Sequence, residues 1–226
     1  MRVHGHDEPV LLVPLGGVPP QDIAQLADDL AGRGLTINVG APAELPAGAY
    51  DRARGQYRAE RVLALMRESR GPRVLGVTER DLYARGMNFV FGIADGLGRA
   101  AVMSLFRLGI GADRATRRER ALKEAVHELG HTFGLPHCAD ARCVMHFSNS
   151  LADTDAKGSD LCVRCRARLG GDAKAAGRRV RTPSSGSAAR ALAARARRSA
   201  VRGGAAPRRC RPRTKAASCP RRRQPR

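Results

Sequence analysis

The strongest constraint on this 226-residue chain lies in residues 127–137, which read HELGHTFGLPH and fit the pattern HExxHxxGxxH. On a helix, the first two histidines of such a pattern lie on one face, so both imidazoles can reach one metal ion. Gly134 is expected to end the helix in the left-handed conformation, which brings His137 back as a third ligand. Three nitrogen ligands leave a fourth tetrahedral position open, as in catalytic zinc sites. The pattern therefore predicts a catalytic zinc held by His127, His131 and His137.

The segment before the pattern favours a helix. Residues 114–126 contain neither Gly nor Pro, and apolar residues recur at helical spacing from Ala121 to Leu129. Glu128 would then lie within reach of the water that the metal activates, as a general base. The alternative is a set of unrelated helix histidines before an ordinary capping glycine. The matched identity and spacing of Gly134 and His137 argue against that coincidence.

Four cysteines form a second metal-ligand pattern directly after the third histidine. They are Cys138, Cys143, Cys162 and Cys165, the last two in a CxxC pair. Two close pairs of thiolates predict a closed tetrahedral site, so we expect a second, structural zinc that orders the polar segment 139–161. Two disulfides and independent buried cysteines remain the alternatives. A chain without a secretory signal is expected in a reducing compartment, which favours metal over disulfides.

The run HELGHTFGLPHC, followed by Cys143-Val-Met145 and Cys162-Val-Arg-Cys165, resembles the archaemetzincins, a branch of the metzincin zinc metallopeptidases. The resemblance implies that the four cysteines hold the second zinc. It also implies that Met145 is the Met-turn residue beneath the histidines, whereas by itself Met145 would be read as an ordinary core residue. Residues 78–82, 88–92 and 99–105 resemble archaemetzincins more weakly. The last of these would correspond to the edge strand along which a metzincin lays its peptide substrate.

The order of apolar runs predicts alternating strands and helices before the zinc helix. Expected strands cover residues 10–15, 35–39 and 73–78, and expected helices cover 21–32 and 57–68. Such alternation implies parallel crossovers. Segments 89–93 and 100–106 are expected to form a hairpin-like element at the sheet edge. With the resemblance, we expect a mixed α/β, zincin-like fold: a twisted, mostly parallel sheet with an antiparallel edge strand and a zinc-binding helix.

Charge divides the chain into two regions. Residues 170–226 contain 18 Lys and Arg residues and one acid, Asp172, and so carry +17 of the formal net charge of +20. We therefore expect a peptidase domain over residues 1–169 and a basic low-complexity tail over 170–226 that is disordered in isolation. The tail could contact polyanions without sequence specificity. The alternatives are a plain solvated tail and the frameshifted or read-through end of a GC-rich gene.

These observations predict a zinc-dependent metallopeptidase that acts on peptide or protein substrates. Glu128 would take a proton from water and later deliver it to the leaving amine. The rival is a zinc-stabilised binding protein whose basic tail carries the function, but a purely structural site has no need for Glu128. No run is long and apolar enough to span a membrane, and residues 9–15 are too short for a signal-peptide core. We expect a cytoplasmic monomer.

Overall fold

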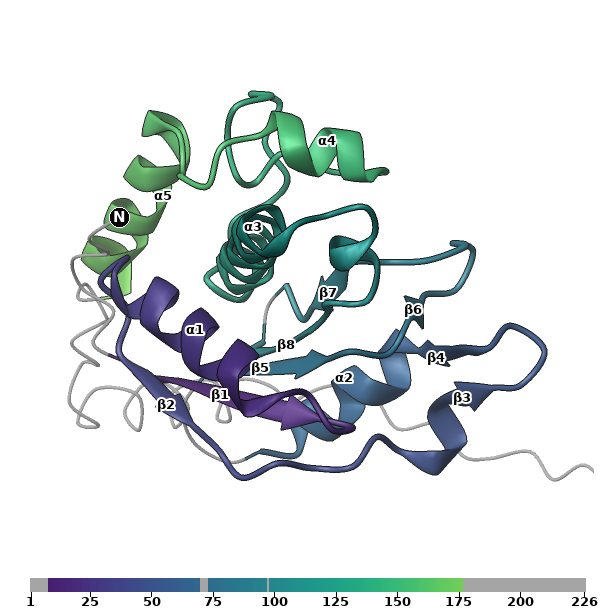
Figure 1. Cartoon of the computed structure of the whole chain (residues 1–226). Helices are drawn as coiled ribbons and strands as arrows, with labels where there is room; N and C mark the ends of the chain where they lie inside the picture. The colour runs from purple at the N-terminus through teal and green to yellow at the C-terminus, as the bar shows by residue number, and fades with distance from the viewer. Residues whose placement is uncertain (1–7, 70–72, 97, 177–226) are drawn as a thin grey trace, which may run out of the picture. The chain divides into compact units, whose positions relative to one another are not determined.

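The computed structural model describes residues 8–69, 73–96 and 98–176 of the chain (Figure 1). The predictions for the part of the tail from residue 177 onwards lie outside the described residues. The strands are β1 Val10–Leu15, β2 Ile37–Val39, β3 Tyr50–Asp51, β4 Gln56–Arg58, β5 Arg73–Thr78, β6 Leu82–Tyr83, β7 Gly92–Ala94 and β8 Ala100–Ser104. The α-helices are α1 Pro20–Ala31, α2 Ala59–Arg67, α3 Arg114–Thr132, α4 Leu151–Ala156 and α5 Val163–Ala176. Two short 3₁₀ helices cover Ala47–Ala49 and Arg107–Gly109.

The main sheet has five strands in the order β2-β1-β5-β8-β7. The first four run parallel, and β7 pairs with β8 in the antiparallel direction. Helices cover both faces, with α1 and α3 on one side and α2 on the other (Figure 1). The central strands β5 and β8 are buried along their whole length, as expected for a sheet covered on both faces. The mixed α/β fold with an antiparallel edge strand is therefore confirmed.

The edge strand that the resemblance implied, residues 99–105, is wrong, although the expected antiparallel pair of neighbouring strands does form at the sheet edge. Residues 100–104 form β8, which lies between β5 and β7, and the antiparallel strand at the edge is β7. Burial explains the difference: all five residues of β8 are buried, whereas the three residues of β7 are half-buried. An interior strand and an edge strand of similar composition cannot be distinguished by a local pattern, because the pairing partners come from elsewhere in the chain.

Several elements were not expected from the sequence. A second, three-stranded sheet has the order β3-β4-β6, and its strands are only two or three residues long. The segment 139–161, expected to be a polar loop, contains α4. Ser150 and Asp153 form a reciprocal capping box at its start, a signal that was present in the sequence. Helix α5 begins within the CxxC pair and continues to Ala176, past the expected domain boundary at 169.

Among the described residues, no helix is long and apolar enough to cross a membrane.

Candidate functional site

Helix α3 carries the first part of the site. Asp113 caps its N-terminus by accepting a hydrogen bond from the Thr116 amide at 2.8 Å. At the other end Gly134 adopts φ +84°, and the amide of Leu135 donates to the Gly130 carbonyl at 3.0 Å. This left-handed termination is the turn predicted for Gly134, and a side chain there would be strained.

The turn brings the three predicted histidines together. One side-chain nitrogen from each of His127, His131 and His137 lies within 4.8 Å of the others, and the Nε2 atoms of His127 and His131 are 3.1 Å apart. Zinc bound tetrahedrally at about 2.0–2.1 Å from each nitrogen would separate the ligands by roughly 3.4 Å. The cluster therefore has the size that a zinc site requires.

Hydrogen bonds on the far side of two rings orient them. Nδ1 of His127 lies 2.8 Å from the Val144 carbonyl, and Nδ1 of His131 lies 2.8 Å from the Leu135 carbonyl. A carbonyl can only accept, so each Nδ1 carries the proton and each Nε2 presents its lone pair to the common centre. This is the tautomer that metal binding needs.

The surroundings also keep the histidines neutral. Burial, followed by the positive charge of Lys157, holds the pKa of His127 well below its usual value. Burial likewise lowers the pKa of His131 and of His137. At neutral pH, protons therefore compete only weakly with a metal ion for the nitrogens of these rings.

Glu128 points into the same region from a fully buried position. Its side chain is 3% exposed, and its Oε2 atom is buried without a hydrogen-bond partner among the described residues. Burial, together with the charge of Glu124 and a hydrogen bond between the two carboxyl groups, raises the pKa of Glu128 well above its usual range. A carboxylate with a raised pKa is a stronger base, as proton abstraction near neutral pH demands.

Two buried charged residues beside the site were missed by the sequence analysis. Glu124 lies one turn before Glu128 on α3, a spacing that could have revealed it. Lys157 follows α4, in the segment expected to be a polar loop, and no local signal marks it. It is 2% exposed, and its Nζ donates to the His146 carbonyl at 3.3 Å and lies 3.5 Å from Nδ1 of His127.

Charged contacts hold helix α4 against α3. Because Lys157 directly follows α4, these contacts also set the position of Lys157. Nε and Nη2 of Arg120 each donate to a separate oxygen of Asp155 at 2.7 Å. Nζ of Lys123 donates to the carbonyls of Thr154 and Asp155, both at 3.2 Å. A bidentate pair of this kind is directional as well as strong, so the chain after α4 enters the site at a defined place.

The backbone of the edge strand approaches Glu128 closely. A Cβ atom on Gly92, the first residue of β7, would lie 2.7 Å from Cγ and Oε1 of Glu128. Only glycine allows this approach, because real Cβ contacts are essentially never so short.

We therefore expect Gly92→Ala to displace the Glu128 carboxylate and to lower kcat for peptide hydrolysis by about a hundredfold, with bound zinc unchanged. Steady-state kinetics and metal analysis of the purified variant would check this. Gly96→Ala is the matched control, since a Cβ there meets nothing within 4 Å. Unchanged kcat in Gly92→Ala would show that the strand does not position Glu128.

Met145 is completely buried next to α3. A Cβ on Gly130 would collide with its sulfur, so the second residue between Glu128 and His131 has to be small. The Met145 carbonyl accepts from the Cys138 amide at 2.9 Å, which connects the chain after the third histidine to the segment of Met145.

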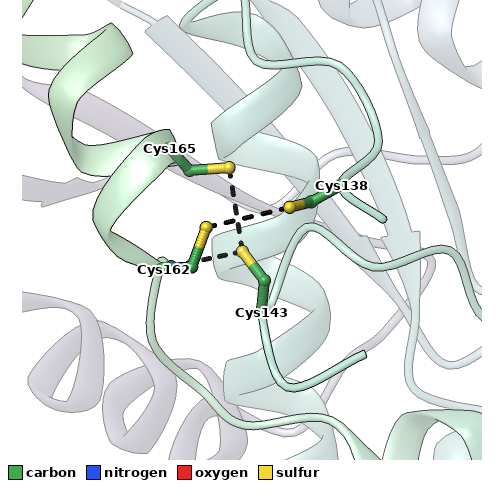
Figure 2. A group of neighbouring side chains, drawn as sticks. All are labelled: Cys138, Cys143, Cys162 and Cys165. Atoms are coloured by element: carbon green, nitrogen blue, oxygen red, sulfur yellow. Dashed lines mark hydrogen bonds between the residues drawn. The ribbon is translucent and has the colours of Figure 1, made fainter. Parts of the chain in front are cut away.

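The four predicted cysteines form a second cluster (Figure 2). All four sulfurs lie within 4.8 Å of one another, with 3.8 Å between Cys138 and Cys162 and 3.8 Å between Cys143 and Cys165. All four cysteines are free, so neither of the proposed disulfides is present. Zinc with four sulfur ligands at about 2.3 Å would separate them by roughly 3.8 Å. Burial raises the pKa of the Cys143 thiol, and the Cys162 amide, which donates to the sulfur of Cys143 at 3.3 Å, acts in the opposite direction.

A cavity of about 570 Å³ opens beside the histidines. One wall is a continuous stretch of chain from residue 86 to residue 94, which ends in β7. The other wall consists of α3 with Glu124 and Glu128, and of residues 147–149. The volume of the cavity is typical of ligand sites, and the histidine cluster forms part of the cavity lining.

Comparison with known proteins agrees with the metallopeptidase function expected from the sequence. The model of peptidase family M54 matches residues 34–170. The archaemetzincin of Pyrococcus furiosus is 42% identical over 175 residues, covering 71% of this chain and 91% of that protein. The crystal structure of Methanopyrus kandleri archaemetzincin has a TM-score of 0.68 at 41% identity, covering 76% of this chain and 98% of that one. The crystal structure of Archaeoglobus fulgidus archaemetzincin, complexed with malonate, has a TM-score of 0.64 at 38% identity, covering 70% and 99%.

Proposed function

Because the chain belongs to peptidase family M54, the archaemetzincins, we propose roles for its individual residues in peptide hydrolysis. The chain is a zinc-dependent metallopeptidase. The proposed ligands of the catalytic zinc are His127, His131 and His137, and the proposed general base is Glu128. The alternative of a zinc-stabilised binding protein without catalysis is not favoured, since the matching family is a peptidase family.

Zinc, when bound, lowers the pKa of water and polarises the carbonyl of the scissile peptide bond. Glu128, which lines the cavity, takes a proton from the attacking water with its carboxylate and then delivers it to the nitrogen of the leaving amine. Its burial keeps the transferred proton away from bulk solvent. The carbonyls of Val144 and Leu135 hold the first two histidine rings in place throughout. Buried Met145 supports α3 from below, as a Met-turn residue would.

The observation that carries this proposal is the convergence of three neutral imidazoles and one unpaired buried carboxylate oxygen on one cavity. It predicts chelator-sensitive cleavage of peptides, restored by added zinc. Purified protein would be assayed against a peptide library by mass spectrometry before chelation, after chelation and after zinc is returned. Cleavage that survives complete removal of zinc would contradict the proposal.

We further propose a second, structural zinc, held by Cys138, Cys143, Cys162 and Cys165, which gives two zinc ions per chain. The support is the sulfur spacing and the free state of the four cysteines. All proposed ligands and the base come from one chain, which is consistent with a monomer.

The basic tail is proposed to be dispensable for chemistry, with the peptidase domain over residues 1–169 and the tail over 170–226. All the proposed ligands and the base precede residue 166. A chain truncated after Ala176, where α5 ends, should keep two zinc ions and the full cleavage rate. It should lose salt-sensitive adsorption to polyanions, because most of the net positive charge is removed.

Cleavage rate and binding to heparin would be compared for full-length and truncated protein at two salt concentrations. A truncated protein that keeps both zinc ions but no longer cleaves would refute a dispensable tail. Equal heparin binding by the two proteins would refute the polyanion contact.

A further inference from the structure

One wall of the cavity ends in a loop without regular structure, residues 86–89, which we call the cleft lip. It lies between β6 and β7 and lines the cavity along its whole length. At its base, the Val90 amide donates to the Leu82 carbonyl at 2.9 Å. At its tip, a turn with Gly86 at φ +78° is closed by the Met87 amide, which donates to the Ala84 carbonyl at 3.0 Å.

The cleft lip is held at Asn88 by the small sheet β3-β4-β6 and by the turn between β3 and β4. The Asn88 carbonyl accepts from Nε2 of Gln56 at 3.0 Å and from Nη2 of Arg54 at 2.9 Å. Gln56, in β4, is 6% exposed, and its Nε2 also donates to Oδ2 of Asp81 at 3.0 Å. Its Oε1 accepts from Nε of Arg54 at 2.9 Å. Both donors of the buried amide are therefore used, one of them to hold the lip.

A second contact holds the lip through Phe89. Arg107 donates from Nε and Nη2 to the two oxygens of Asp81, both at 2.7 Å, and its guanidinium lies 4.2 Å from the centre of the Phe89 ring. Asp81 thus joins Gln56 and Arg107 into one network that reaches the lip at two points. A bidentate pair stacked on an aromatic ring restricts motion more than single surface contacts do.

Two large apolar side chains of the cavity lining are exposed to solvent. Met87, in the lip, and Phe147, in the opposite wall, are each 40% exposed, although both are large apolar side chains. The Phe147 ring also packs against His137 with 4.8 Å between centroids, so this apolar surface continues up to the histidine cluster. Exposed apolar groups gathered at a cavity mark a binding surface rather than chance exposure.

We propose that the cleft lip, positioned by Gln56, selects peptide substrates with a large apolar side chain close to the scissile bond. This inference rests on the proposed function of the histidine cluster and adds its substrate class. Met87 contacts the substrate side chain, whereas Gln56 is a positioning residue that acts through the lip. Burying an apolar side chain against Met87 and Phe147 gives a preference of about tenfold over a polar side chain of similar size.

Three variants distinguish an effect on the position of the cleft lip from an effect on the stability of the whole protein. Gln56→Glu keeps the shape of the side chain but removes both donated hydrogen bonds and places a carboxylate next to Asp81. Met87→Gln removes the apolar contact and leaves the network intact. Tyr83→Phe is the matched control, because it removes a hydrogen bond of the same small sheet, from Tyr83 Oη to Asp51 at 3.1 Å, that does not touch the lip.

The zinc-loaded full-length proteins would be assayed on a synthetic peptide library, with cleavage sites read by mass spectrometry. KM and kcat would then be measured for two peptides that differ only in having Leu or Gln at the selected position. We expect Gln56→Glu and Met87→Gln to raise KM for the Leu peptide about tenfold, with kcat within about twofold, because binding is lost and chemistry is not. Tyr83→Phe should keep the preference.

A wild-type protein without apolar preference, or a preference retained in both lip variants, would overturn the inference. If Gln56→Glu fails to fold, Met87→Gln alone decides. Capture of library peptides by Glu128→Gln protein provides an independent binding measurement. If the captured peptides are enriched in apolar side chains but the wild-type protein cleaves none, the proposed function is refuted and the selectivity of the cleft lip is supported. If the wild-type protein cleaves peptides but the captured peptides show no such enrichment, the proposed function is supported and the selectivity of the cleft lip is refuted.

Discussion

Glu128→Ala is expected to lower the rate of peptide hydrolysis by roughly a thousandfold while leaving zinc content unchanged. The side chain acts on water and not on the metal, and the three nitrogen ligands remain in place. Its Oε2 atom is buried without a hydrogen-bond partner among the described residues, and the hydrogen bond to Glu124 is the carboxyl contact that the substitution removes. The raised pKa of Glu128 makes it the carboxylate of the site best suited to carry a proton.

The measurement is the turnover of a cleaved library peptide, with metal analysis of the same samples. Glu128→Gln should behave like Glu128→Ala, since it keeps the volume and removes only the base. Glu119→Ala is the matched control on the same helix, because this glutamate is exposed and, among the described residues, forms an ion pair with Lys123 alone. Wild-type turnover in Glu128→Ala would mean that the assigned mechanism is wrong.

Cys162→Ser is expected to remove one zinc ion per chain and to lower Tm by on the order of 10 °C, or about 3 kcal/mol for a domain of this size. Zinc held by four thiolates is coupled to folding, and the cluster connects residues that are distant in sequence. Cys143 and Cys165 are buried in the main core, next to Val144, Met145 and Leu161. Losing the metal would therefore loosen the chain that carries Met145 beneath α3.

His137→Ala provides the contrast. It should weaken the catalytic zinc but lower Tm much less, because His137 is exposed and lies outside the core. Cys210→Ser, in the basic tail and without a ligand-spaced partner in the sequence, should change neither quantity. Zinc analysis and thermal melts of the three variants test this, and an unchanged Tm in Cys162→Ser would exclude a structural role for the cysteine cluster.

Sequence patterns alone were enough to predict the parts of the site that depend on local geometry. The spacing of His127 and His131 is a helical repeat, and Gly134 provides a turn that few other residues allow. The CxxC pair likewise places two thiols within reach of one metal. These patterns were sufficient to identify the histidine and cysteine sets that the structure brings together.

The sequence could not determine features that depend on pairing between distant segments. The order of β8 and β7 is one example, because both are short apolar strands and only their neighbours decide which is buried. The burial of Lys157 is another: it lies in a polar stretch, and its environment is created by α3 and by the ion pair between Arg120 and Asp155. Side-chain patterns record which face of an element is apolar, but not which other element covers it.

The cleft lip shows the same limit most clearly. Gln56 and Asn88 are 32 positions apart, and neither belongs to a motif, yet their hydrogen bond fixes one wall of the cavity. Strands of two or three residues, such as β3 and β6, have too little periodicity to be recognised locally and exist because each of them pairs with β4. The sequence was thus sufficient to predict which side chains are candidates to bind the metal and to activate water. Which residues line the cavity beside the histidines depends on the tertiary structure, because that lining is made by segments that meet through folding.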